Sequence, residues 1–138
     1  MHIVIPGPPR TKKTGNRIVS AGVRKRIIPS KAHEAWFASA MSHAFAIKAE
    51  LRKTCVLPVD DYVTVKARFY LDLLNFAQPG VGDLAGYIQA FGDLLEAAQI
   101  ITNDKNILSW DGSRVCFDLA NPRIEADVLI ITGDWRYD

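Results

Sequence analysis

Aspartate residues are the side chains of this chain whose type and spacing indicate chemistry. Asp83, Asp93, Asp104 and Asp111 all lie within residues 81–114. Carboxylates gathered at the ends of elements repel one another unless a cation lies among them. Mg²⁺ prefers oxygen ligands and keeps several waters that phosphate chemistry can use. The spacing therefore predicts a magnesium site for phosphate chemistry, centred on Asp83 and Asp104.

An amphipathic helix over residues 81–98 would position the first two of these carboxylates. Its apolar residues recur at intervals of three and four, which is typical of one buried helical face. They are Leu84, Tyr87, Ile88, Phe91, Leu94, Leu95 and Ala98. Asp83 precedes this stripe, where its carboxylate can accept a backbone N–H and favour the helix dipole. A helix cap with no further role is the alternative interpretation of Asp83.

Asp104 lies in a turn-rich segment, residues 102–106, that precedes a short strand-like segment. If that strand lies beside the strand that precedes the helix, Asp83 and Asp104 meet at one edge of the sheet. Under that condition we expect the two carboxylates to share one Mg²⁺ ion. An ordinary turn aspartate is the alternative for Asp104.

The first 31 residues hold a dense positive charge, although the whole chain carries a formal charge of only +2. They contain no Asp or Glu, and their basic residues are Arg10, Lys12, Lys13, Arg17, Arg24, Lys25, Arg26 and Lys31. Such separation suits a protein that grips phosphates with one region and performs chemistry with another. We expect every one of these residues except Lys31 to contact a nucleic acid. A solvated basic hairpin without a partner is the alternative.

Composition and length fit one domain over residues 1–138, because 49% of the residues are hydrophobic and 23% are charged. Cys55 and Cys116 have no spacing typical of a zinc or redox site. No sustained apolar run resembles a signal peptide or a membrane span. We therefore expect a cytoplasmic protein with free thiols and no membrane partner.

The order of predicted elements is a strand at 2–5, a hairpin at 16–29, a helix capped by Ser30, a long strand at 61–74, the helix at 81–98 and two final strands. This order predicts an α+β fold, a small mixed sheet of about five strands with two helices on one face. The long strand alternates, and Val63, Val65, Ala67, Phe69 and Leu71 would face the core. Its other face is rich in Lys, Arg and Tyr. That face fits either a nucleic-acid backbone or the wet side of a sheet.

Three segments together resemble one family, the RusA-like Holliday junction resolvases. They are the opening IVIPGPPRTKK, the stretch GDLAGYIQAFGDLLEAAQIITNDKNI and the closing NPRIEADVLI. In the family the helix opens with Asp-x-Asp-Asn, carries a middle Asp and is followed by an Asp-Asp-x-Gln-Ile turn. Here Asp83 matches the first Asp, Asp93 the middle one, and Asn103, Asp104 and Ile107 the turn.

The resemblance implies a homodimeric, Mg²⁺-dependent endodeoxyribonuclease of recombination and repair, encoded by bacteria or phages. Such an enzyme hydrolyses phosphodiesters of four-way DNA junctions, and two symmetric sites would nick opposed strands. It needs no organic cofactor. The implied catalytic residues are Asp83, Asp104 and Lys105, and the implied metal ligands are Asp83, Asp104 and Asp93.

The chain departs from the family at three positions. Ala85 stands where the family has its second metal-binding Asp, Gly86 where it has Asn, and Gln89 where it has the catalytic Lys. Lys105 would replace the missing lysine as an electrostatic stabiliser. Asp93, Asp72 and Asp111 are the alternatives for the missing carboxylate.

Two other classes of function remain open on the sequence. The first is a non-catalytic or weakly catalytic junction-binding protein of the same fold, in which the aspartates are caps and turn residues. The second is a small-molecule enzyme, which predicts a deep apolar pocket and no affinity for DNA. Gly86 and Gly92 interrupt the predicted helix and indicate close approach of another backbone, for which a dimer contact is one cause.

Overall fold

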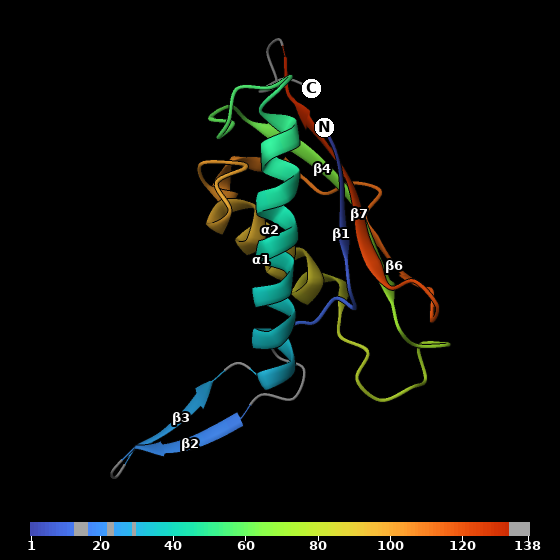
Figure 1. Cartoon of the computed structure of the whole chain (residues 1–138). Coiled ribbons are helices and arrows are strands. Elements are labelled where there is room, and N and C mark those ends of the chain that lie inside the picture. The colour runs from blue at the N-terminus through green and yellow to red at the C-terminus, as the bar shows by residue number, and fades with distance from the viewer. Residues whose placement is uncertain (13–16, 22–23, 29, 133–138) are drawn as a thin grey trace.

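A mixed five-stranded sheet forms the body of the protein (Figure 1). The computed structural model describes residues 1–12, 17–21, 24–28 and 30–132, with the backbone alone for 17–28. β1 (His2–Pro6), β7 (Arg123–Ile130) and β4 (Val63–Leu71) are successive antiparallel neighbours. β5 (Ile107–Ser109) and β6 (Arg114–Phe117) pair with β4 in parallel, one after the other along its length.

Two helices, α1 (Lys31–Leu51) and α2 (Leu84–Ala97), cover one face of this sheet (Figure 1). Both begin at the predicted caps. Ser30 Oγ accepts a hydrogen bond from His33 N at 3.1 Å, and Asp83 Oδ1 accepts one from Gly86 N at 2.9 Å. A single 3₁₀ turn, η1 (Asp104–Asn106), follows α2. The predicted α+β architecture is confirmed.

The core lies between the helices and the inner face of the sheet. Val63, Val65, Ala67, Phe69 and Leu71 of β4 are at most 1% exposed, as the two-residue period predicts. The Phe69 ring contacts the rings of two α2 residues, with centroid distances of 5.6 Å to Tyr87 and 6.2 Å to Phe91. These contacts fix α2 along the length of β4.

The outer face of the sheet carries cations that are paired within the chain. Arg68 forms an ion pair with Glu125 at 3.3 Å, and Arg123 pairs with Glu125 at 2.8 Å and with Asp118 at 2.9 Å. The Arg123 guanidinium also lies 3.9 Å from the centre of the Tyr70 ring. Because Arg68 and Arg123 are already paired, a nucleic acid would have to compete with these carboxylates for them.

The basic N-terminal segment contains a separate two-stranded sheet. β2 (Arg17–Ala21) and β3 (Arg24–Ile28) pair antiparallel, with Arg17 opposite Ile28 and Ala21 opposite Arg24. This basic ribbon, residues 17–21 and 24–28, extends away from the body beyond the start of α1 (Figure 1). The predicted hairpin is confirmed. Across the described part of the chain, no helix combines the length and apolar character needed to cross a membrane.

Candidate functional site

The structure does not bring Asp83 and Asp104 together, so the predicted shared ion site is wrong in its geometry. The condition behind the prediction holds, because β5 does lie beside β4. The two strands are parallel, however, and Ile107 pairs with Val63, the first residue of β4. Asp104 precedes β5 and therefore lies at the start of β4, whereas Asp83 follows the end of β4. Nine residues of strand separate these two ends, roughly 26 Å.

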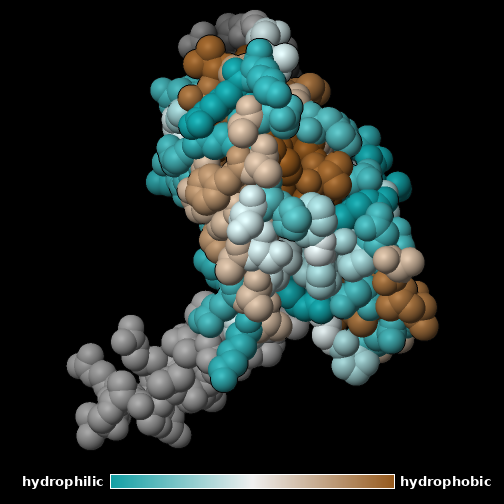
Figure 2. Space-filling view, viewed as in Figure 1, coloured by the Kyte–Doolittle hydropathy of each residue, from teal (hydrophilic) through white to brown (hydrophobic). Residues whose placement is uncertain are grey.

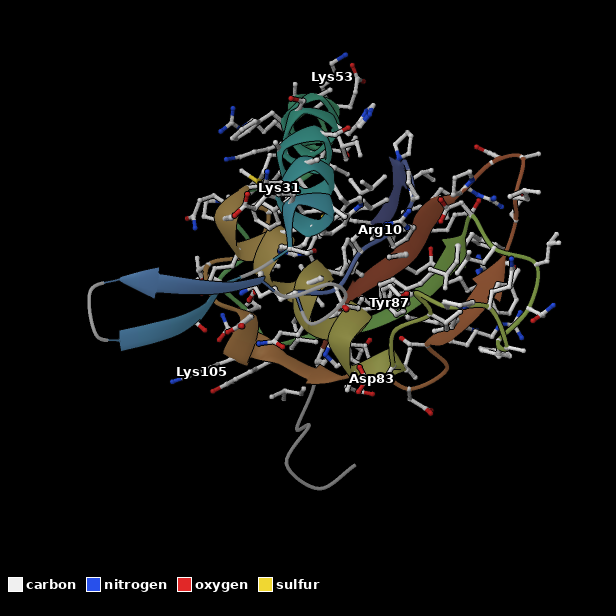
Figure 3. All side chains as sticks on the ribbon, turned by 90° about the horizontal axis from the view of Figure 1, so that it is seen from below. Arg10, Lys31, Lys53, Asp83, Tyr87 and Lys105 are labelled. Carbon is white, nitrogen blue, oxygen red and sulfur yellow. The ribbon has the colours of Figure 1, made fainter. Side chains whose placement is uncertain are left out.

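Contacts along α2 also place the two aspartates apart, although by less than the length of β4. A Cβ atom on Gly92 would lie 3.8 Å from the Cβ of Asp104, whereas Asp83 caps the helix nine residues earlier. At 1.5 Å per residue this corresponds to about 13 Å. Figure 3 shows Asp83 and Lys105, the neighbour of Asp104, at separate places on the body. Mg²⁺ ligands lie near 2 Å from the ion, so this pair does not fit one ion.

Asp93, the third predicted metal ligand, is paired with a lysine. Its Oδ2 atom lies 2.8 Å from Lys12 Nζ. The contact is an ion pair without hydrogen-bond geometry, since the buried Oδ2 atom has no hydrogen-bond partner. Within the described residues, no three His, Cys, Asp or Glu side chains are grouped closely enough to hold a metal ion. The carboxylates of this chain are therefore distributed rather than clustered.

Arg10, a predicted DNA contact, is held by an intramolecular partner instead. Its two terminal nitrogens donate to the two carboxylate oxygens of Asp72, each at 2.9 Å, and Nη1 also donates to the Pro9 carbonyl at 3.0 Å. The hydrogen bonds and charge of Arg10 lower the pKa of Asp72, and Asp72 raises the pKa of Arg10. A phosphate would have to displace Asp72 to bind this guanidinium, and its contact with DNA stays a prediction.

Polar groups lie around Tyr87 in the first turn of α2, and Figure 3 shows this residue between Arg10 and Asp83. The Tyr87 hydroxyl accepts a hydrogen bond from Gly82 N at 3.0 Å. Burial raises the pKa of Tyr87, and the charges of Asp72 and Asp83 add to that effect while Arg10 opposes it. Asp72 and Asp83 thus both lie within electrostatic range of one buried phenol.

The remaining predicted residues lie at the surface. Lys105 is exposed on η1, where its backbone N–H donates to Asn103 Oδ1 at 2.9 Å. Asp111 is exposed in the turn between β5 and β6. Cys55 and Cys116 are free thiols, as expected. Neither Lys105 nor Asp111 lies on the α2 turn that carries Asp83.

Four of the predicted DNA-contacting residues lie on the basic ribbon. Arg17, Arg24 and Arg26 occupy register positions on one face of β2 and β3, and Lys25 occupies the other, because Arg17 pairs with Ile28, Ala21 with Arg24 and Val19 with Arg26. Lys13 lies outside the described residues. Before the ribbon, Arg10 pairs with Asp72 and Lys12 pairs with Asp93.

The neck of the ribbon contains residues that the sequence did not single out. His33 is 4% exposed, and its Nδ1 lies 3.2 Å from the Arg10 carbonyl oxygen. Thr11 is 2% exposed and packs against Gly86 in the first turn of α2. A histidine three residues after a helix cap carries no local signal for such a contact. Its partner lies 23 positions earlier in the chain.

A groove of about 700 Å³ lies between the start of α1 and the end of α2. Its lining mixes charged, polar and apolar side chains, including Lys12, His33, Phe37, Asp93, Glu96 and Gln99. This groove differs from the deep apolar pocket expected of a small-molecule enzyme. No family model and no curated protein matches the chain.

Proposed function

We propose that this protein binds DNA through the basic ribbon, with branched DNA such as a four-way junction as its target. The observation that carries this proposal is the ribbon itself. A segment that contains no acidic residue forms a separate two-stranded sheet extending from the body. A two-stranded β-ribbon has the width of the DNA major groove, and arginine forms strong bidentate contacts with phosphate and guanine.

Charge distribution supports the ribbon over the sheet as the binding surface. On the outer face of the sheet, Arg68 and Arg123 are paired with carboxylates of the same chain. On the ribbon, three arginines share one face by register. A phosphate would gain more from cations that have no nearby acidic sequence neighbour, because each paired cation must first lose its partner. The junction preference itself comes from the resemblance to RusA-like resolvases.

Binding assays on labelled four-way junction and duplex DNA test this proposal. Replacing Arg17, Arg24 and Arg26 by Ala should weaken binding and reduce the slope of log K against log salt by about 0.9 for each lost phosphate contact. The matched control replaces Lys48, Arg52 and Lys53 at the far end of α1, which removes the same charge. A wild-type protein that binds no DNA, or equal losses in both triple variants, would contradict the proposal.

Mg²⁺-dependent cleavage of the junction is the second candidate, and one observation favours it. Asp72 and Asp83 lie near the same phenol, at the end of β4 where β4 and β6 run parallel. Ligand sites of sheets with parallel strands are commonly found beyond the carboxyl ends of those strands. Asp72 is engaged by Arg10, so these residues do not form a ready metal site, and no catalytic step is assigned to them.

Nicking of a labelled junction with and without MgCl₂ tests the second candidate. Asp83→Asn should abolish nicking while preserving the fold, because Asn caps a helix nearly as well as Asp. Asp104→Asn tests the residue that the sequence predicts as the second metal ligand beside Asp83. Asp61→Asn, a change in an exposed residue before β4, is the control. Nicking that persists in Asp83→Asn would remove this residue from any catalytic role.

A further inference from the structure

The basic ribbon joins the body through a neck made of residues 10–12 on one side and Ser30 to His33 on the other. We infer that Arg10, Lys12 and His33 are positioning residues that hold the ribbon in one direction on the body, and that none of them contacts DNA. This inference rests on the proposed DNA-binding function, and it reassigns two residues that the sequence predicted as phosphate ligands.

The first fixed point ties the two sides of the neck to each other. Arg10 is held at its side chain by Asp72, at the end of β4, and at its carbonyl oxygen by His33 Nδ1. His33 lies in the first turn of α1, directly after the cap that ends the ribbon segment. Its ring contacts Trp36 and Phe37, with centroid distances of 5.7 Å and 5.9 Å. The start and the end of the ribbon segment are therefore bridged by a buried ring.

The second fixed point is Thr11, which is packed on the first turn of α2. A Cβ atom on Gly86 would lie 3.0 Å from Thr11 Cγ2 and 3.2 Å from Thr11 Cβ. The absence of a side chain at Gly86 thus allows Thr11 to approach the helix closely. Because Thr11 is 2% exposed, this part of the neck belongs to the protein interior.

The third fixed point is the ion pair between Lys12 and Asp93, in the middle of α2. A phosphate that took Lys12 would leave a buried carboxylate oxygen of Asp93 without its cation, which costs free energy. Three consecutive residues therefore attach to three separate places: the end of β4, the first turn of α2 and the middle of α2. These three attachments fix the path of the chain up to Lys12, the last residue described before the ribbon.

Asp93→Asn distinguishes whether Lys12 positions the ribbon or contacts phosphate, because the two roles predict opposite changes in DNA affinity. If Lys12 positions the ribbon, losing its partner should weaken junction binding by about tenfold, as the competent direction becomes a minor population, with no change in salt slope. If Lys12 contacts phosphate, freeing it should raise both affinity and slope. Glu96→Gln, one turn later on α2, is the matched control for charge removal. Affinity of Asp93→Asn equal to or above that of Glu96→Gln would overturn the inference.

A measurement without DNA distinguishes failure of this inference from failure of the proposed function. Spin labels at Ser20→Cys on the ribbon and Ser42→Cys on α1, with Cys55 and Cys116 replaced by Ser, report their distance distribution. The distribution should be narrow in this labelled protein, which serves as the parent of the variants. It should be broad after Lys12→Ala and narrow again in the charge swap Lys12→Asp with Asp93→Lys. A broad distribution in the parent overturns the fixed neck. A narrow distribution in a protein that binds no DNA overturns the proposed function alone.

Discussion

At the scale of single residues, the two glycines of α2 lie in different surroundings, and only one of them leaves no room for a side chain. Gly86 lies where a Cβ atom would be 2.8 Å from Asp83 Oδ1 and 3.0 Å from Thr11 Cγ2. Gly92 would meet only ordinary contacts, 3.7 Å to Trp110 and 3.8 Å to Asp104. The close neighbour at Gly86 therefore belongs to the same chain, and no second subunit is needed to explain it.

Gly86→Ala and Gly92→Ala should change stability in opposite directions. Alanine at 86 collides with the helix cap and with Thr11, which costs about 1–3 kcal/mol. Alanine at 92 fits and gains about 0.5–1 kcal/mol from helix propensity. Urea unfolding of both variants checks this. Equal stabilisation by both would show that the contact between Thr11 and the first turn of α2 is not tight.

The pairing of Arg10 with Asp72 predicts a pH dependence of stability. The pKa of Asp72 is lowered from its ordinary 3.8 in the folded protein. A lowered pKa means that the pair stabilises the fold fully above about pH 4 and loses that contribution as the pH falls below 3.8. Asp72→Asn should therefore cost about 1 kcal/mol at pH 7, a figure reduced by partial solvent screening. The difference from the wild type should shrink toward pH 3, and a constant difference in chemical unfolding would contradict the pairing.

At the scale of elements, the strands of the basic ribbon and those of the body pair in two separate sheets. β2 pairs with β3, whereas β1, β4, β5, β6 and β7 form the main sheet. The contact between Arg10 O and His33 Nδ1 shows that the two sides of the neck are adjacent. A short connection can therefore span the neck without moving either side.

Replacing residues 15–28 by a short Gly-Ser linker should remove DNA binding and leave the body folded. Shortening a surface loop changes its closure entropy only slightly, so the free energy of unfolding should stay within about 1 kcal/mol of the wild type. Urea unfolding and junction binding measure the two effects. Retained junction affinity would mean that the main sheet, rather than the ribbon, binds DNA.

At the scale of the whole molecule, exposed apolar side chains are the feature that bears on association. Phe45 on α1 is 54% exposed, and Leu74 and Phe76, in the loop between β4 and α2, are 67% and 68% exposed. Figure 2 shows an apolar patch at the lower right, where Figure 1 draws this loop. The homodimer expected from the sequence remains a prediction, and its natural interface is the apolar stripe of α1 at Phe37, Met41 and Phe45, spaced by four residues.

Phe45→Ser should shift the homodimer toward monomer. In a two-fold interface the change occurs twice, and each buried phenylalanine contributes about 1.5–3 kcal/mol, so the dissociation constant should rise by more than about a hundredfold. Leu74→Ser, on the loop before α2, is the control and should leave the constant unchanged. Sedimentation velocity at micromolar concentration measures both. A monomeric wild-type protein would end this prediction.

The sequence by itself determined the elements, because their signals are local. The period of two along β4 predicted which residues are buried, and the period of three and four predicted α2. Ser30 and Asp83 were predicted as caps from residue type and position, and the ribbon was predicted from two short strands around a turn. Each of these features depends on neighbours within about one or two turns of the chain.

Only the tertiary structure decided which charged groups meet. The separation of Asp83 from Asp104 follows from the parallel direction of β5 along β4, and strand direction leaves no mark in the local sequence. The partner of Arg10 is Asp72, 62 residues away, and nothing near either residue specifies that pairing. β1 and β4 are both antiparallel to β7 and therefore run in the same direction, which brings the residues that follow them to one edge of the sheet. The carboxylates that the sequence grouped by type are therefore separated by the fold, and two cations predicted for DNA are paired with carboxylates of the same chain.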